Sequence, residues 1–170
     1  LDSEMAKELL NDPKEVAEHL MLVDLAVEDL SQVAEVGSVH IAEQMKIDRY
    51  AYVMHLVSRV TATLAPEFDP LDAYLACMNM GTLTGSPKVP AMEAIYEYEE
   101  QPRGPYGGAI GYLDGQGRLD TAIVIRSAVV RQGRATVQAG AGIVADSEPH
   151  KELEETTNKA NAIIRAIEGQ

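Results

Sequence analysis

The chain has 170 residues, of which 46% are hydrophobic, 24% charged and 5% aromatic, so it is long enough for a folded domain with a mainly aliphatic core. Its net charge of −13 argues against a nucleic-acid partner, since so acidic a surface repels phosphates. No apolar run approaches the roughly 20 residues of a membrane span, and the single Cys77 cannot form an internal disulfide. We therefore expect a cytoplasmic protein that does not enter a membrane. Because the chain begins Leu-Asp, we also expect it to be a piece of a longer protein.

The first predicted helix starts at Asp12-Pro13 and runs to about Leu30, because aspartate caps helices and proline suits the first helical position. One face carries an apolar stripe at helical spacing: Val16, Leu20, Val23, Val27 and Leu30. The opposite side carries Met21, Leu22 and Leu25, so the middle of this helix is expected to be buried on two faces. Glu18 falls on that second apolar face, where a carboxylate needs a partner or a metal.

Two extended segments are predicted next. Residues 37–47 are typical of an extended chain. Residues 50–64 also fit a helix, but their many β-branched and aromatic side chains favour a strand. In that strand His55 would share a face with Val53, Val57 and Arg59.

The middle of the chain predicts two helices separated by a loop. Asp69-Pro70 opens a helix that ends near Met78, and residues 81–85 form the loop. Ser86-Pro87 is expected to cap the next helix, which ends near Glu99.

Three strands with tight connections are predicted over residues 106–113, 119–130 and 135–144, as an antiparallel meander. Pro149 then starts the last helix, with a predicted buried stripe of Leu153, Thr157, Ala160, Ile164 and Ile167. The order of helix, strands, helices, meander and helix predicts an α+β fold, with antiparallel sheets and flanking helices.

Acidic side chains on two of these helices are candidate metal ligands. Glu152, Glu155 and Lys159 share one face of the last helix, which by itself is typical of a solvated face with one ion pair. Glu18 from the first helix favours a different interpretation. Mg²⁺ is usually held by one or two carboxylates together with ligand oxygens and water, and two glutamates from separate helices would form such a site.

Other residues have two interpretations each. Arg126 interrupts the apolar run TAIVIRSAVV; in a central strand it needs an anion such as a carboxylate, whereas on an edge strand it lies in water. His55 is either a general acid or base or a satisfied, half-buried histidine. The glycines of YGGAIGY and AGAG mark either bulges or a ligand lying against the backbone. The remaining histidines show no zinc-ligand spacing with His55.

Several long strings occur in an order that is specific to one family. They are EHLMLVDL, DRYAYVMHLVSRV, CMNMGTLTGSPKVPAME, RGPYGGAIGY, DTAIVIRS and VQAGAGIVADSEPHKELEETTNKA. Over nearly its whole length the chain resembles the C-terminal part of the chorismate-binding domain of the chorismate-binding enzymes, and within them the anthranilate synthase component I members. The resemblance implies that residues 1–170 are the C-terminal part of one catalytic domain whose N-terminal portion is absent.

The resemblance also implies roles for individual residues. Glu18 and Glu155 match Mg²⁺-binding glutamates, with Glu15 and Glu152 as alternative or neighbouring ligands. His55 matches a histidine associated with pyruvate elimination. The remaining matches are substrate-binding: Tyr106 and Arg126 at the enolpyruvyl carboxylate, and Thr82, Gly142 and Lys159 at the ring carboxylate.

The implied reaction converts chorismate and ammonia to anthranilate and pyruvate, with the ammonia supplied by a separate glutamine amidotransferase component. Sibling enzymes that make aminodeoxychorismate, isochorismate or salicylate are the alternative, as is a non-catalytic fragment that only folds and binds. Where the family usually reads DLARNDLGRV, Val27-Glu28 replaces Arg-Asn, which removes a cation and adds an anion near the predicted metal helix. We expect the isolated 170 residues to be inactive, because half of the substrate enclosure is missing.

Overall fold

The computed structural model describes residues 2–49 and 54–169 of the chain. These residues form two compact units, one ending at Met78 and the other beginning at Asn79. Both contain helices together with two-stranded antiparallel sheets, which confirms the predicted α+β class.

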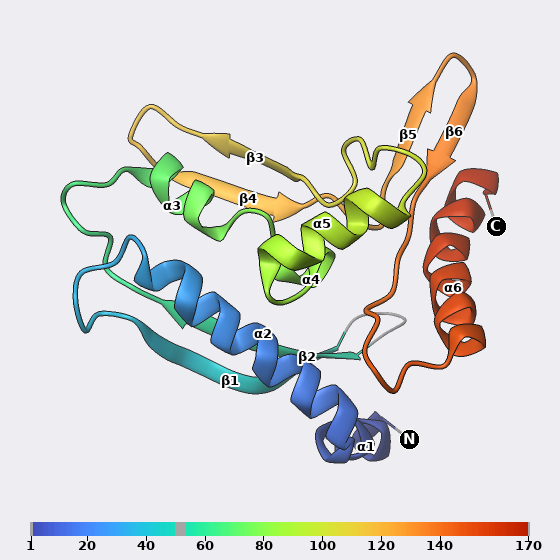
Figure 1. Cartoon of the computed structure of the whole chain (residues 1–170), viewed down its shortest axis with the longest axis horizontal. Helices are drawn as coiled ribbons and strands as arrows, with labels where there is room; N and C mark the ends of the chain where they lie inside the picture. Colours follow the sequence, from blue (N-terminus) through green and yellow to red (C-terminus); the bar gives the residue numbers. More distant parts are fainter. Residues whose placement is uncertain (1, 50–53, 170) are drawn as a thin grey trace. The chain divides into compact units, whose positions relative to one another are not determined.

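Two helices open the first unit (Figure 1). The first, α1, spans Asp2–Asn11 and was not predicted, whereas α2 spans Pro13–Ser31, close to the predicted bounds. The Asp12 side chain accepts hydrogen bonds from the backbone N–H groups of Lys14 and Glu15 at 2.9 and 3.3 Å. The predicted cap at the start of α2 is therefore confirmed.

The sheet of the first unit is a hairpin of β1, His40–Arg49, and β2, Met54–Thr61. It confirms both extended predictions over the described residues; residues 50–53 of the predicted strand 50–64 lie outside them. The register shifts twice within β1, and there Met45 adopts a left-handed φ of 52°. The pairing is therefore interrupted by a bulge rather than continuous.

The core of the first unit lies where α2 packs on this hairpin (Figure 1). Val23 and Leu25, from the two predicted apolar faces of α2, are both buried, which confirms that the middle of the helix is covered on both sides. Leu20 and Met21, nearer its start, are exposed. The third helix, α3, spans Pro70–Cys77, begins at the predicted Asp69 cap and also packs on α2.

The described residues of the second unit, 79–169, include three helices. A loop prediction for residues 81–85 was wrong: Gly81–Thr84 form one helical turn, α4, because the N–H groups of Leu83 and Thr84 bond to the Met80 carbonyl at 2.9 and 3.1 Å. The next helix, α5, spans Lys88–Tyr98. Its cap residue is Pro87, without a side-chain bond, so the predicted Ser86 cap is not formed.

The strands of the second unit form two separate antiparallel hairpins (Figure 1). They consist of β3, Ala109–Leu113, with β4, Leu119–Ile123, and of β5, Ala128–Arg131, with β6, Arg134–Val137. The tight turns were correctly predicted, but the three-stranded meander was wrong. Arg126 has a left-handed φ of 50°, which ends the extended path that the sequence predicted over residues 119–130. The predicted last strand also ends early, since residues 138–144 are irregular.

The final helix, α6, spans Pro149–Glu168 and contacts β6. Its predicted buried stripe was wrong, because Leu153, Ile164 and Ile167 are 67%, 38% and 50% exposed. The most buried residue of the helix is Glu152, at 8% exposure. Across the described residues of the second unit, no hydrophobic side chain is buried, so the apolar face of α6 has no core to cover it. The described residues also include no helix long and apolar enough to cross a membrane.

Candidate functional site

Three segments of the second unit meet at Tyr106, Gly140 and Lys159. The Lys159 ammonium, on α6, donates a hydrogen bond to the Gly140 carbonyl at 3.1 Å. A Cβ atom added at Gly140 would lie 3.2 Å from the Tyr106 hydroxyl oxygen, which is closer than side chains ordinarily approach. The AGAG string therefore has a glycine here because the tyrosine lies against the backbone. Two of the predicted substrate-binding residues, Tyr106 and Lys159, are brought together in this way.

The acidic residues of α6 differ in their surroundings. Glu155 forms an ion pair with Lys159 one turn later, and the two side chains are 48% and 24% exposed. Glu152 is buried at 8% exposure. The solvated-face interpretation therefore fits Glu155. It does not fit Glu152, because the side chain of Glu152 is shielded from water, which is unusual for a carboxylate. Lys159 is held by both a carboxylate and a carbonyl, which fixes the position of its charge.

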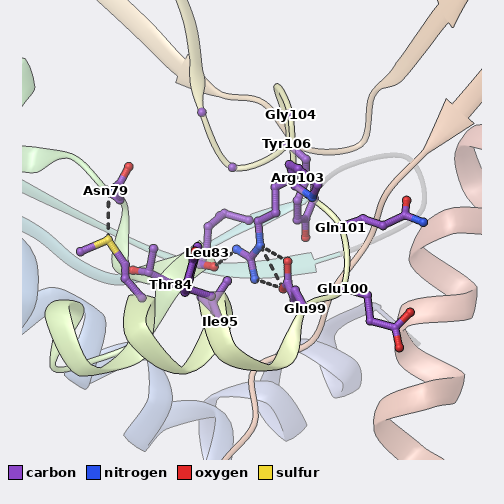
Figure 2. Close-up of a pocket in the computed structure, with 15 residues that line it drawn as sticks. Asn79, Leu83, Thr84, Ile95, Glu99, Glu100, Gln101, Arg103, Gly104 and Tyr106 are labelled. Atoms are coloured by element: carbon purple, nitrogen blue, oxygen red, sulfur yellow. Dashed lines mark hydrogen bonds and ion pairs between the residues drawn. The ribbon is translucent and has the colours of Figure 1, made fainter.

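A cavity of about 690 Å³ lies beside this cluster, between α4, the C-terminal end of α5 and the loop that contains Tyr106. Figure 2 shows the Arg103 side chain extending across it from the loop, toward Glu99 on one side and Leu83 on the other. Its Nε donates to both Glu99 carboxylate oxygens at 3.0 and 2.9 Å, and Nη1 donates to the Leu83 carbonyl. The guanidinium carbon lies 5.8 Å from the centre of the Tyr106 ring, within cation–π range.

The pairing of Arg103 with Glu99 shifts the pKa of both groups. The hydrogen bonds from Arg103 hold the pKa of Glu99 below its ordinary value, against an opposing effect of partial burial. The same bonds raise the pKa of Arg103. Both groups therefore carry full charge at neutral pH.

Three further predicted substrate-binding residues lie at the surface. Thr82, in α4, Arg126, at the break between β4 and β5, and Gly142, in the irregular segment after β6, are all exposed. Arg126 thus lies neither in a central strand nor on an edge strand, the two settings that the sequence suggested. The next residue after Thr82 is Leu83, whose carbonyl accepts from Arg103, so α4 is connected to the cavity.

The other predicted residues belong to the first unit. Glu18, on α2, is half-buried and forms an ion pair with Lys14 at 3.7 Å, while Glu15, in the first turn, is exposed. His55 lies on β2 opposite Asp48 and is exposed, so the half-buried interpretation of this histidine was wrong.

The half-buried histidine of the first unit is His19, beside Glu18 on α2. It shares a hydrogen bond with the Ser58 hydroxyl at 2.7 Å, and Ser58 in turn accepts the Met45 N–H at 2.9 Å. Burial lowers the pKa of His19, which favours the neutral ring. This connection ties α2 to the bulge in β1.

The chemistry of the acidic residues suits Mg²⁺, which prefers carboxylate oxygens. Glu18 belongs to the first unit and Glu155 to the second, and each is paired with a lysine four residues away on its own helix. Each carboxylate is thus already the partner of a cation. Within residues 2–49 and 54–169, no three His, Cys, Asp or Glu side chains gather in a way that would hold a metal.

Sequence reasoning missed the pair of Glu99 and Arg103. Their separation by four residues is a recognisable signal for an ion pair on a helix. The predicted helix ended near Glu99, however, so Arg103 was expected to lie in a loop. In a loop, a separation of four residues does not predict that two side chains meet.

Comparison with known proteins gives one consistent result. The family model described as chorismate binding enzyme matches residues 1–165 of the chain. Anthranilate synthase component 1 from Escherichia coli (strain K12) is 59% identical over 98% of the chain, and that from Vibrio parahaemolyticus is 57% identical over 99%. The chain spans about a third of these curated relatives, 32% and 31% of their lengths.

Solved structures agree with this result. The crystal structure of anthranilate synthase component I from Streptococcus pneumoniae TIGR4 matches 95% of the chain with a TM-score of 0.92 and 48% sequence identity. A protein described as a 2,3-dihydroxybenzoate-specific isochorismate synthase from Bacillus anthracis matches 98% of the chain with a TM-score of 0.87 and 29% identity. The chain covers 37% and 44% of those two structures.

Proposed function

The chain belongs to the family of chorismate binding enzymes, and from this premise we propose that it supplies the C-terminal part of the catalytic domain of an anthranilate synthase component I. The proposed reaction takes chorismate and ammonia to anthranilate, pyruvate and water in the cytoplasm, as a step toward tryptophan. The ammonia comes from a glutamine amidotransferase partner. The identities of 57–59% to proteins of that name, against 29% to an isochorismate synthase, favour anthranilate as the product.

The contact among Tyr106, Gly140 and Lys159 is the observation that carries this proposal. Chorismate is a dianion, and a chain of net charge −13 binds it only where cations are held in place. The ammonium of Lys159 is positioned by the Gly140 carbonyl, and the Tyr106 hydroxyl lies against the same glycine. A fixed cation and a phenol donor that meet at one glycine suit the recognition of the two carboxylates of chorismate.

Each of the remaining residues has a proposed role in binding or proton transfer. Lys159, Gly142 and Thr82 hold the ring carboxylate, while Tyr106 and Arg126 hold the enolpyruvyl carboxylate. His55 handles the proton when pyruvate is eliminated.

Glu18 and Glu155 are the proposed holders of Mg²⁺, with Glu152 and Glu15 beside them on the same two helices. Bound Mg²⁺ supplies positive charge that stabilises the ring carboxylate as the ring hydroxyl departs. In support, each of these carboxylates already pairs with a lysine cation four residues away on its own helix.

Product analysis tests the proposal. The complete subunit that contains this chain is incubated with chorismate, Mg²⁺ and ammonium, and the products are separated by chromatography. We expect anthranilate and pyruvate in equal amounts. Isochorismate, salicylate or aminodeoxychorismate as the product would assign the chain to a sibling activity. The structural match to the isochorismate synthase makes isochorismate the first of these to look for.

A further inference from the structure

All three guanidinium nitrogens of Arg103 donate to protein partners. Its side chain is 23% exposed, and it donates to both oxygens of Glu99 and to the Leu83 carbonyl. An arginine in a bidentate pair with a carboxylate is fixed in one geometry by that pair. The role of this side chain is therefore to hold neighbouring groups in place.

The groups that it holds come from three different segments. Glu99 lies at the C-terminal end of α5, and Leu83 lies in α4, directly after Thr82. Tyr106 belongs to the loop before β3, and its ring lies under the guanidinium. Figure 2 shows the bonds from Arg103 to Glu99 and to Leu83, with Tyr106 close by.

Tyr106 is therefore held at two points. The guanidinium of Arg103 lies over its ring, and the backbone of Gly140 lies against its hydroxyl. These two neighbours limit a change of the χ1 angle of Tyr106, which is the movement that would displace its hydroxyl. Recognition of a carboxylate by a phenol depends on such placement, since a hydrogen bond weakens steeply as its distance and angle depart from the optimum.

We propose that Arg103, held by Glu99, is a positioning residue that fixes the Tyr106 hydroxyl and α4 for the binding of a carboxylate of the substrate. The proposal rests on the proposed function of Tyr106 and Thr82 as substrate-binding residues. It adds two residues to the site, neither of which contacts the substrate.

The test uses the complete subunit and three variants: Arg103→Lys, Tyr106→Phe and the double variant. Lysine keeps the positive charge but cannot bridge Glu99 and Leu83 with a planar fork. We expect Arg103→Lys to raise the KM and the calorimetric Kd for chorismate roughly tenfold while kcat changes much less, because carboxylate binding is lost equally in the ground and transition states. In the Tyr106→Phe background, Arg103→Lys should raise the KM and Kd for chorismate hardly any further, since the hydroxyl that Arg103 positions is gone.

The pair Asp114 and Arg118 provides a matched control. It is another carboxylate–arginine pair four residues apart in the same unit, with Nε to Oδ2 at 2.7 Å in the β3–β4 turn. Arg118→Lys should leave the KM and Kd unchanged. If Arg103→Lys lowers Tm while chorismate affinity stays at the wild-type value, or if the losses from Arg103→Lys and Tyr106→Phe multiply in the double variant, the positioning role is wrong. Should Arg103→Lys fail to fold, Glu99→Gln gives the same comparison with a smaller change.

These readouts also separate this proposal from the proposed function. Chorismate consumption and calorimetric chorismate binding do not depend on which product forms. A wild-type subunit that makes a product other than anthranilate would overturn the proposed activity, while the effect of Arg103 on chorismate affinity would still decide its positioning role.

Discussion

Among single residues, Glu155 is the one whose replacement tests the metal most directly. Glu155→Gln in the complete subunit keeps the size of the side chain but removes the charge that now pairs with Lys159. We expect Mg²⁺-dependent chorismate consumption to fall roughly 100-fold, because an amide is a much weaker ligand for Mg²⁺ than a carboxylate. The measurement is the initial rate over a range of Mg²⁺ concentrations. Its control is Glu154→Gln, an exposed neighbour on the same helix; an unchanged Mg²⁺ dependence in Glu155→Gln would show the metal assignment to be wrong.

The ion pair of Glu99 with Arg103 predicts a pH dependence of stability. The hydrogen bonds from Arg103 lower the pKa of Glu99 from its ordinary value of 4.5, so the folded state binds this proton more weakly than the unfolded state. The stabilisation is therefore present above pH 4.5 and is lost as the pH falls through the lower pKa of the folded state. We expect the Tm difference between wild type and Glu99→Gln to be constant from pH 5 upward and to shrink below pH 4.5. A difference that grows on acidification would contradict this sign.

At the scale of elements, the hairpin of β3 and β4 depends on one glycine. A Cβ atom added at Gly111 would lie 2.1 Å from the Asp120 carbonyl oxygen and 2.8 Å from Thr121 Cα, so the strands would have to separate. Gly111→Ala should destabilise the complete subunit by about 1–3 kcal/mol, the usual range for overpacking. Urea unfolding measures this, with Gly115→Ala as the control because nothing lies within 4 Å of a Cβ atom there. Equal stability of the two variants would mean that the strands can open without cost.

The elements that the sequence predicted well are those with a cap or a strong period. Asp12 and Asp69 cap α2 and α3 as expected, because an aspartate directly before a proline is a strong signal for the start of a helix. The first helix, α1, has no such start signal, and α4 is one turn long, too short for any periodicity. The break at Arg126 was not predictable from an apolar run, because hydrophobicity does not encode the φ angle of a single residue.

For the candidate site, the sequence suggested residues but not their contacts. The family resemblance implied that Tyr106 and Lys159 bind the substrate. Their approach to Gly140 depends on the path of the chain between β6 and α6. Burial of the apolar stripe of α6 was inferred from its period alone. The period identifies the apolar face of a helix, but it does not say whether the chain contains the residues that cover that face.

At the scale of the whole molecule, the uncovered face of α6 predicts how the 170 residues behave alone. Leu153 and Ile167 are at least half exposed, and the chain spans about a third of the relatives that it matches. We expect no chorismate consumption by the 170 residues, and activity only from a subunit as long as those relatives. The expected physical sign is binding of a hydrophobic dye by the short chain, which the complete subunit should lack. Anthranilate formed by the 170 residues alone would overturn this expectation.

The left-handed backbone at Arg126 has a consequence for how this protein can be engineered. A non-glycine residue at φ 50° costs about 1–2 kcal/mol relative to a relaxed one, and alanine would carry the same cost. Arg126→Gly removes that strain, so we expect it to be more stable in urea than Arg126→Ala, although both lack the cation proposed to hold a carboxylate. Selection of the complete subunit for thermal resistance alone should therefore enrich glycine at this position, and the surviving variants should have lost turnover. Under such selection, substitutions at residue 126 would raise the stability of the protein and lower its activity.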